Sequence, residues 1–343
     1  MSERIPVVVA GVGHLGSIHA RVLSELPEAE LIGVLDADRA RAEAQGEKLG
    51  VPAFTSVEDL PERLRAAIVA TPTSSHRDVA SRLLERGVDV LVEKPIAKTP
   101  AEGRELVELA RRHERVLMVG HSERFNPVVL ALEGQPLAPR FIESQRVSPF
   151  SFRSADVGVV LDMMIHDIDI ILHLVRSPVS GVHAVGVPVI GRTTEDLANA
   201  RIVFENGAVA NVTASRVALK TERLMRIFSR DAYVSLDFHQ KQGRIVRKGK
   251  ALRDGDVDLA EAFASAPSPL HFMQQSLVEM TELSVPEIEP LKAEDRAFLD
   301  AVARRAEPPV TGEQGVEALE VAERIVASLR ESLSRAGEDE ALA

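Results

Sequence analysis

The chain of 343 residues contains no cysteine and no tryptophan, and Tyr233 is its only tyrosine. The lack of cysteine excludes disulfides, thiol catalysis and cysteine-ligated metals, although it does not report the compartment. No hydrophobic run approaches the roughly 18 residues of a membrane-spanning helix, and the N-terminus lacks the hydrophobic segment of a signal peptide. We therefore expect no membrane partner and, by default, a cytoplasmic protein.

Positive charge is also scarce, because 41 lysines and arginines face 52 aspartates and glutamates, which gives a net charge of −11 at neutral pH. Nonspecific binding to nucleic acid needs a basic surface, so the composition argues against a nucleic-acid partner. The content of hydrophobic residues (45%) and charged residues (27%) is ordinary for a globular protein. The length exceeds what one hydrophobic core usually organises, which predicts two domains.

The strongest local pattern lies at the N-terminus. The β-branched residues within 5–10 predict a buried parallel strand, Gly11-x-Gly13-x-x-Gly16 follows it, and a stretch with helical periodicity comes next. In such a turn the first glycine makes the bend, the second lets the backbone approach a pyrophosphate, and the third lets helix and strand pack closely. The helix N-terminus offers N–H groups and a positive dipole end to the phosphates. The pattern predicts a dinucleotide site.

A second predicted strand, residues 31–35, ends in Asp36, about 20 residues after the last glycine of the turn. A carboxylate at this place accepts both ribose hydroxyls of an adenosine and repels a 2′-phosphate, which favours NAD over NADP. Arg39 is the one feature that would weaken this preference. The alternative interpretation is a structural glycine turn followed by a surface aspartate.

Strands alternate with helices over about 120 residues, which predicts a doubly wound parallel sheet of the α/β class. Ligands bind beyond the carboxyl ends of such strands, where Thr71, Lys94 and His121 would lie. Later strand-like runs with short turns predict an antiparallel sheet with helices on one side. These runs are 179–190, 197–204, 208–215, 221–229 and 233–238.

Three segments follow from this organisation. We predict a Rossmann NAD-binding domain over residues 1–122 and an acidic tail over residues 335–343. Between them, residues 123–334 are predicted to form an α+β domain with a mostly antiparallel open sheet, which binds substrate and supports oligomerisation.

A second group of polar side chains lies within residues 162–173. In a helix, Asp162, His166, Asp169 and His173 would share one face, because they recur at i, i+4, i+7 and i+11. The rest of this segment is mostly hydrophobic, and a buried polar stripe is costly unless it is hydrogen-bonded or lines a cavity. His166 is the best general base in the chain, since imidazole titrates near neutral pH, and Asp162 would fix its tautomer.

Two alternatives remain for these four groups. They would either satisfy one another in a core or bind a divalent metal, as His and Asp at helical spacing can. No ligand from a third segment is evident, so we predict no metal. Asp167 lies off the stripe and is expected to be a structural partner.

Arginines and phenylalanines gather just before this helix, namely Arg140, Arg146, Phe150, Phe152 and Arg153. Guanidinium groups bind phosphate through two parallel hydrogen bonds, so arginines in an acidic protein suggest an anionic substrate. The alternative interpretation is a solvated strand edge.

Several motifs occur together: Gly11-Val12-Gly13-His14-Leu15-Gly16, Glu93-Lys94-Pro95 and Asp162-x-x-x-His166-x-x-Asp169. With them the chain resembles the Gfo/Idh/MocA family of NAD(P)-dependent oxidoreductases over essentially its whole length. Members typically oxidise a ring hydroxyl of a sugar, cyclitol or nucleotide sugar. The resemblance implies that Lys94 positions the substrate and assists proton transfer, that His166 is the base, and that Asp162 is an orienting or substrate-binding partner.

The resemblance also implies the remaining site residues. The glycine-rich turn with His14 and Leu15 would hold the cofactor, together with Asp36, Thr71, Pro72, His76, Glu93, Lys94 and Pro95. Gly120-His121 and Arg124-Phe125-Asn126-Pro127 resemble the domain junction of the family. The substrate would be bound by Arg124, Asn126, Arg146, Arg153, Asp162 and His166.

Residues 150–153 are similar to members that oxidise the 3-hydroxyl of UDP-N-acetylglucosamine, and this similarity implies the same substrate here. Two other functions are open: an NAD-dependent glycoside hydrolase of the same family, and a non-catalytic sensor of dinucleotide or sugar. The presence of Lys94 and His166 argues against the sensor, which needs no base. Since the open sheet needs cover, we also expect a homodimer or homotetramer.

Overall fold

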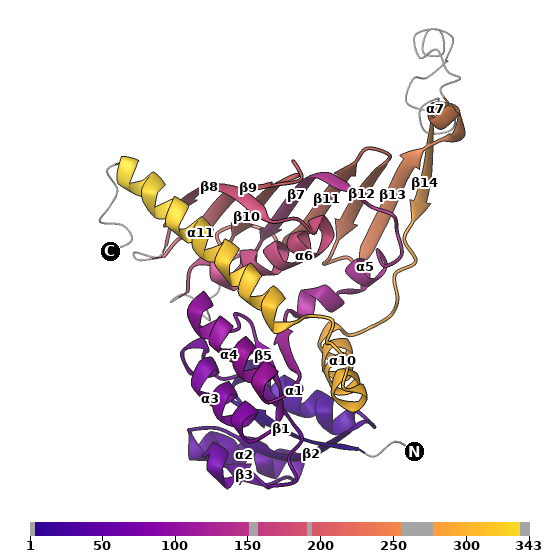
Figure 1. Ribbon diagram of the computed structural model, residues 1–343. Helices are drawn as coiled ribbons and strands as arrows, with labels where there is room; N and C mark the ends of the chain where they lie inside the picture. The colour runs from indigo at the N-terminus through magenta and orange to yellow at the C-terminus, as the bar shows by residue number, and fades with distance from the viewer. Residues whose placement is uncertain (1–3, 151–156, 191–193, 255–276, 337–343) are drawn as a thin grey trace. The chain divides into compact units, whose positions relative to one another are not determined.

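The structure is a computed structural model that describes residues 4–150, 157–190, 194–254 and 277–336. The chain forms two compact units (Figure 1). Unit 1 comprises Met1–Phe125 and Ile288–Val321, and unit 2 comprises Asn126–Glu287 and Ala322–Ala343.

Unit 1 contains a six-stranded parallel sheet with the strand order β3-β2-β1-β4-β5-β6. Its strands are β1 (Ile5–Ala10), β2 (Ala29–Leu35), β3 (Ala53–Phe54), β4 (Ala66–Val69), β5 (Asp89–Glu93) and β6 (Leu117–Gly120). The valines at positions 7–9 have no exposed surface, as expected for a strand covered by helices on both faces. The predicted doubly wound parallel sheet is confirmed.

Helical segments connect these strands: α1 (His14–Glu25), α2 (Arg39–Leu49), η1 (Val57–Asp59), α3 (Thr73–Glu85) and α4 (Pro100–Arg112). A further one, η2 (Ser122–Phe125), follows β6. Local sequence sets several of their ends. The Asp38 carboxylate accepts the Arg41 N–H at the start of α2, and the Thr99 hydroxyl accepts the Glu102 N–H at the start of α4. Gly50, with φ of 67°, ends α2 in the left-handed conformation that glycine favours.

Residues 288–321 pack on unit 1, which corrects the prediction that placed them in the second domain. The helix α10 (Pro290–Arg304) packs against α1 and η2, and its Phe298 is fully buried. The Val310 carbonyl accepts the Val119 N–H, and Thr311 forms a bridge to Met118 at the open edge of β6. The edge strand is thus covered by a segment far along the chain, for which the local sequence carries no signal.

Unit 2 contains an eight-stranded sheet with the strand order β14-β13-β12-β11-β7-β10-β9-β8. The strands are β7 (Pro139–Val147), β8 (Val179–Val187), β9 (Leu197–Phe204), β10 (Val209–Ser215), β11 (Glu222–Ser229), β12 (Ala232–Asp237), β13 (Gln242–Lys248) and β14 (Val278–Glu282). The five predicted strands are present as β8 to β12, and the mostly antiparallel sheet is confirmed. The unpredicted β7 lies in the middle, parallel to β10 and antiparallel to β11.

The helices of unit 2 are α5 (Pro127–Leu130), the π-helical turn η4 (Val160–Met164), α6 (Ile165–Val175), α7 (Lys250–Asp254) and the second half of α11 (Gly312–Ala336). The α6 helix packs on one face of the sheet, which we call the inner face (Figure 1). Ser328 of α11 accepts the Ala184 N–H from β8.

The opposite, outer face of this sheet carries three aromatic rings on neighbouring strands. The ring centroids of Phe141 and Phe228 are 5.7 Å apart, and those of Phe228 and Tyr233 are 4.9 Å apart. Phe228 remains more than a third exposed. Such a face suits a partner subunit, and the homodimer or homotetramer stays a prediction.

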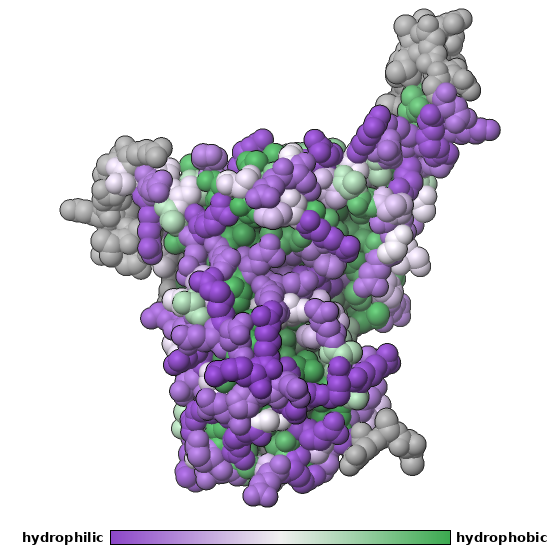
Figure 2. All heavy atoms as spheres, in the orientation of Figure 1, coloured by the Kyte–Doolittle hydropathy of each residue, from purple (hydrophilic) through white to green (hydrophobic). Residues whose placement is uncertain are grey.

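Hydrophilic side chains cover most of the face seen in Figure 2. Within the described ranges, the helices lack the combined length and hydrophobicity of a membrane span. Most of the predicted acidic tail lies outside the described residues, and its first two residues end α11.

Replacing Phe298 tests whether the late segment belongs to the core of unit 1. Phe298→Ala removes a fully buried ring and leaves a cavity, so we expect a loss of about 3–5 kcal/mol in the free energy of unfolding. Urea unfolding of the full chain measures this loss. The control is Asp300→Ala on the exposed side of α10, which should change the value by less than about 0.5 kcal/mol. Equal stability of the two variants would contradict the packing.

Candidate functional site

The glycine-rich turn brings β1, α1 and β4 into close backbone contact. A Cβ on Gly11, whose φ is 85°, would lie 2.5 Å from the Thr71 nitrogen, and a Cβ on Gly16 would lie 1.7 Å from the Gly11 carbonyl oxygen. Neither distance is tolerable, so packing within the protein demands both glycines. At Gly13 a Cβ would meet nothing within 4 Å, which leaves the open space that a pyrophosphate needs.

The N-terminus of α1 opens into the same region. The helix begins at His14, and no side chain caps it at Gly13. Both His14 and Leu15 are exposed. An anion bound here would face the N-terminus of α1, as phosphates do where dinucleotides bind.

Asp36 follows β2 and is largely buried. Its Oδ2 accepts the Val12 N–H at 2.9 Å, and its Oδ1 accepts the Asp38 N–H at 2.9 Å. The guanidinium of Arg41 lies 3.3 Å from Oδ1, whereas Arg39 pairs with Glu43. The arginine at this carboxylate is thus Arg41 and not Arg39. Arg41 lies in the first turn of α2, where its side chain contacts Asp36 after the end of β2.

The loops after β4 and β5 are tied together by His76 of α3. Its Nδ1 lies 2.9 Å from the Pro95 carbonyl oxygen, and its Nε2 lies 2.9 Å from the Thr71 carbonyl oxygen. Burial lowers the pKa of His76, against the opposing effect of these carbonyls. His76 therefore braces the two loops that carry Thr71 and Pro95. Its predicted contact with the cofactor stays a prediction.

Glu93 ends β5 and is almost fully buried. One carboxylate oxygen, Oε2, accepts the backbone N–H of Lys94 at 3.1 Å. The other, Oε1, lies 2.9 Å from Nε2 of His19. The side chain of Lys94 is half-buried, and the bond between Lys94 and Pro95 is cis. Glu93 thus anchors the backbone of the residue that the sequence predicts to be catalytic.

His19 contacts carboxylates through both ring nitrogens. Its Nδ1 lies 2.8 Å from Oδ1 of Asp295 in α10, and the imidazole has no exposed surface. Burial by itself would lower the pKa of His19, but the carboxylates of Asp295 and Glu93 raise it well above its ordinary value. Neither His19 nor Asp295 was predicted from the sequence. A histidine at a core-facing position of α1 could have indicated a buried polar contact. Nothing in the sequence indicated that its partner lies 276 residues away.

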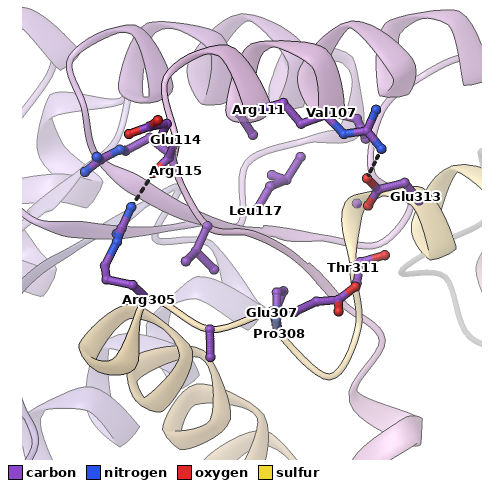
Figure 3. Close-up of a pocket in the computed structure, with 14 residues that line it drawn as sticks. Val107, Arg111, Glu114, Arg115, Leu117, Arg305, Glu307, Pro308, Thr311 and Glu313 are labelled. Atoms are coloured by element: carbon purple, nitrogen blue, oxygen red, sulfur yellow. Dashed lines mark hydrogen bonds and ion pairs between the residues drawn. The ribbon is translucent and has the colours of Figure 1, made fainter.

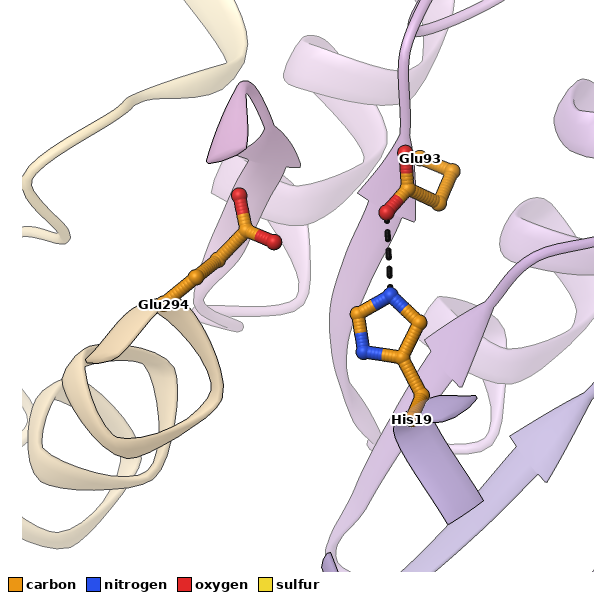
Figure 4. A group of neighbouring side chains, drawn as sticks. All are labelled: His19, Glu93 and Glu294. Atoms are coloured by element: carbon orange, nitrogen blue, oxygen red, sulfur yellow. Dashed lines mark hydrogen bonds and ion pairs between the residues drawn. The ribbon is translucent and has the colours of Figure 1, made fainter. Parts of the chain in front are cut away.

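Figure 4 shows Glu294 near His19 and Glu93. In the part of the chain that the structure describes, His19, Glu93 and Glu294 have donor atoms suited to a metal, all within 4.8 Å of one another. Both nitrogens of His19 already contact carboxylates, however, which is the arrangement of a protonated imidazole rather than of a metal ligand. We interpret His19 and Glu93 as a hydrogen-bonded pair rather than as metal ligands.

In unit 2, the predicted polar stripe lies on a helix that begins with a π-helical turn. Asp162 belongs to η4 and His166 is the second residue of α6, so the predicted uninterrupted helix is wrong at its start. Asp162, His166 and His173 are half-buried, whereas Asp169 is buried. The carboxylate of Glu195 accepts the Val160 N–H at 3.1 Å and so satisfies the beginning of the turn.

A buried ion pair fixes α6 to the central strand β7. Two nitrogens of Arg146 each lie 2.9 Å from one carboxylate oxygen of Asp167, and the side chains of both residues are at most 3% exposed. The guanidinium also lies 5.8 Å from the ring centroid of Phe238. Because β7 lies inside the sheet, the alternative of a solvated strand edge is wrong at Arg146. The predicted structural role of Asp167 agrees with this contact.

The other predicted substrate residues have different surroundings. Arg140 donates to the Asn206 carbonyl at the surface. Arg124 is buried in η2 of unit 1, and Asn126 of unit 2 caps α5 by accepting the Val128 N–H. Arg153 and Phe152 lie outside the described residues. Substrate contacts of Arg124, Asn126, Arg146 and Arg153 stay predictions.

A cavity of about 280 Å³ lies at the other end of the unit 1 sheet (Figure 3). It is lined by α4, by the first residue of β6, Leu117, and by the segment after α10. Its arginines are engaged, since Arg111 pairs with Glu313 at 2.7 Å and Arg305 donates to the Glu114 carbonyl. In parallel sheets ligands bind at the carboxyl ends of the strands, so this cavity is separate from the dinucleotide site.

Comparison with known proteins decides the family. Residues 5–121 match the oxidoreductase family with an NAD-binding Rossmann fold, and residues 135–235 match the Gfo/Idh/MocA C-terminal domain. The chain is 38% identical to UDP-N-acetylglucosamine 3-dehydrogenase of Acidithiobacillus ferrooxidans over 266 residues, which covers 75% of this chain and 84% of that relative. The chain belongs to the Gfo/Idh/MocA family of oxidoreductases.

Solved structures agree with this assignment. The structure of that relative, GnnA, superposes with a TM-score of 0.85 at 32% identity, and the match covers 96% of this chain and 99% of GnnA. Levoglucosan dehydrogenase in complex with NADH and levoglucosan has a TM-score of 0.78 at 20% identity and covers 96% of this chain and 98% of its own, which shows the same fold. This Gfo/Idh/MocA member is an oxidoreductase that acts on CH–OH groups, and its Rossmann domain is of the NAD-binding kind.

The structure gathers the predicted cofactor residues at the carboxyl ends of the unit 1 strands. They are Gly11, Gly13, His14, Leu15 and Gly16 after β1, Asp36 after β2, Thr71 and Pro72 after β4, and Glu93, Lys94 and Pro95 at the end of β5. Open space at Gly13, the uncapped N-terminus of α1 and the carboxylate of Asp36 fit a dinucleotide. Which of these residues touch NAD stays a prediction.

Replacing Asp36 tests its role in cofactor choice. Asp36→Ser removes the acceptor for the ribose hydroxyls, and hydrogen bonds to charged groups suggest a loss of NADH affinity of about tenfold or more. It also releases Arg41 from its carboxylate, so we expect tighter binding of NADPH. Fluorescence titration with NADH and NADPH measures both.

The matched controls for Asp36→Ser separate the two arginines. Adding Arg41→Ala should abolish the gain for NADPH, whereas adding Arg39→Ala should preserve it, because Arg39 pairs with Glu43. Unchanged affinity for NADH in Asp36→Ser would show that this carboxylate does not hold the ribose.

Removing Arg146 tests the buried ion pair. Arg146→Ala leaves the Asp167 carboxylate buried without its partner, which should lower the free energy of unfolding by about 3–5 kcal/mol. Adding Asp167→Asn should recover part of the loss, since the buried charge is then gone. The surface variant Arg140→Ala should stay within about 0.5 kcal/mol of the wild type. Chemical denaturation measures all three, and wild-type stability of Arg146→Ala would refute the structural role.

Proposed function

We propose that this protein is an NAD-dependent dehydrogenase that oxidises the 3-hydroxyl of UDP-N-acetylglucosamine. The observation that carries the proposal is the 38% identity to a UDP-N-acetylglucosamine 3-dehydrogenase across 84% of that relative. The two residues proposed to carry out such a reaction, Lys94 and His166, are both present. A dehydrogenase needs a base for the hydroxyl proton and a group that orients the hydroxyl.

His166 is the proposed base. When bound, NAD supplies a hydride acceptor at C4 of its nicotinamide. The hydroxyl proton then passes to the imidazole of His166, and the oxidised carbon becomes a carbonyl. The imidazole is half-buried on α6, which keeps it reachable by a substrate. Asp162, on the turn before α6, is proposed to orient the imidazole and to stabilise its protonated form.

Lys94 is proposed to hold the reacting hydroxyl through its ammonium group and to assist proton transfer. Its backbone is fixed from two sides, because Glu93 accepts its N–H and His76 contacts the Pro95 carbonyl. An anchored backbone limits where a long side chain can place its nitrogen. This pre-organisation is what positioning catalysis requires.

An exposed arginine on the inner face supports a substrate with a diphosphate. Arg223 of β11 lies directly opposite Arg146 of β7, so the two side chains lie on one face of the sheet. Arg146 is buried with Asp167, whereas Arg223 is exposed. We propose that Arg223 contributes to binding the diphosphate, a contact that the sequence analysis did not include.

An NADH absorbance assay with a panel of substrates tests the proposed reaction. UDP-N-acetylglucosamine should give NADH, and free N-acetylglucosamine and myo-inositol should give far less, because they lack the nucleotide diphosphate. A signal from free sugars or inositols alone would refute the proposed substrate. Release of free sugar without net NADH would instead identify a glycoside hydrolase.

Substitution of the two proposed catalytic residues tests the mechanism. Lys94→Met and His166→Asn should each lower kcat by about 10²–10⁴-fold, the range of general acid–base contributions. NADH affinity should stay nearly unchanged in His166→Asn, since His166 is not among the predicted cofactor residues. The matched controls are Lys98→Met and His183→Asn, two exposed residues outside the proposed site. Wild-type turnover of UDP-N-acetylglucosamine in Lys94→Met or His166→Asn would remove that residue from the mechanism.

A further inference from the structure

The buried cluster behind Lys94 is not used by the proposed reaction. It joins three elements of unit 1: His19 comes from α1, Glu93 from the end of β5, and Asp295 from α10. All three side chains are buried, His19 and Asp295 completely. Charged groups are rarely retained in a protein core unless they are paired, so their arrangement calls for a physical role.

The two contacts of His19 indicate a doubly protonated ring. A neutral imidazole has one N–H and one lone pair, so it donates to only one of two carboxylates. With Nδ1 at 2.8 Å from Asp295 and Nε2 at 2.9 Å from Glu93, both nitrogens donate when the ring is charged. The raised pKa of His19 agrees with this geometry.

The cluster reaches Lys94 through one carboxylate. His19 holds Oε1 of Glu93, and Oε2 of Glu93 accepts the backbone N–H of Lys94. Gly120 of the adjacent strand leaves the space that this carboxylate fills, since a Cβ there would lie 3.0 Å from Oε1. The Glu93 carboxylate therefore lies packed between Gly120 of β6, His19 of α1 and the backbone N–H of Lys94.

We propose that His19 is a positioning residue, which clamps the Glu93 carboxylate so that the backbone of Lys94 is held in its working place. Asp295 orients the imidazole from the opposite side. The consequence for turnover rests on the proposed catalytic function of Lys94, whereas the consequence for the Lys94 backbone does not.

Two amide variants separate the two contacts of His19. Asn places its side-chain NH₂ near the position of Nδ1, and Gln places its NH₂ near the position of Nε2. His19→Asn therefore keeps a donor to Asp295 and loses the donor to Glu93, whereas His19→Gln does the reverse. Both variants remove the same charge, so each is the matched control of the other.

The experiment measures hydrogen exchange at the Lys94 amide and steady-state kinetics on the full chain with NAD and UDP-N-acetylglucosamine. His19→Asn should speed exchange of the Lys94 amide at least about tenfold, because the carboxylate that accepts this N–H is no longer held. It should lower kcat by about 10–100-fold with little change in KM, as loss of supporting contacts around a working group does. His19→Gln should stay close to the wild type in both.

The outcomes decide the inference whether or not the substrate is right. Equal effects of the two variants, or unchanged Lys94 exchange in His19→Asn, would overturn it. If the wild type does not oxidise UDP-N-acetylglucosamine, the proposed substrate fails and amide exchange alone decides the clamp. Metal analysis adds a further check. One equivalent of zinc or manganese in the wild type, lost in His19→Asn, would make the imidazole a ligand and overturn the proposal.

Discussion

The close approach of α1 to β1 is the constraint on which the nucleotide-binding unit depends. Only hydrogen at Gly16 lets the helix backbone reach the Gly11 carbonyl, and the same approach leaves open space at Gly13. The helix that presents its N-terminus to the phosphates also carries His19 to Glu93, one turn further along. Cofactor binding and the support of Lys94 therefore depend on the same helix, and a shift of α1 would disturb both.

In the second unit, a buried ion pair and not a close backbone contact fixes the helix that carries a proposed catalytic residue. The helix that carries His166 is fixed to the sheet by the buried pair of Arg146 and Asp167, and its first turn is satisfied by Glu195. Hydrophobic side chains of similar volume would stabilise the contact between helix and sheet to a similar extent. They would, however, leave the rotation of the helix about its axis and its position along the strand less well defined. A guanidinium that meets a carboxylate through two parallel hydrogen bonds sets direction as well as distance. Both units thus place buried charge directly behind a proposed catalytic side chain.

Sequence reasoning succeeded where the signal was local. Gly11-x-Gly13-x-x-Gly16, Asp36 and the strand ends predicted the dinucleotide edge, because turn geometry and periodicity depend on neighbouring residues. It failed where a partner comes from far along the chain. No residue near Asp295 in the sequence indicates that Asp295 contacts His19. From the sequence alone, Arg146 was predicted to bind phosphate, whereas its partner in the structure is Asp167. The π-helical turn at Asp162 was missed for a related reason, since its beginning is held by Glu195.

The return of residues 288–321 to unit 1 bears on how the chain is made. A ribosome delivers residues 126–287, nearly all of unit 2, before the last piece of unit 1 emerges. Until then the edge of β6 lacks the segment that pairs with it, and His19 lacks Asp295. Domains that are continuous in sequence can fold as they emerge, one after another. Here unit 1 is completed only after residues 126–287 have been synthesised, so until then the buried imidazole of His19 has Glu93 but not Asp295 as its carboxylate partner.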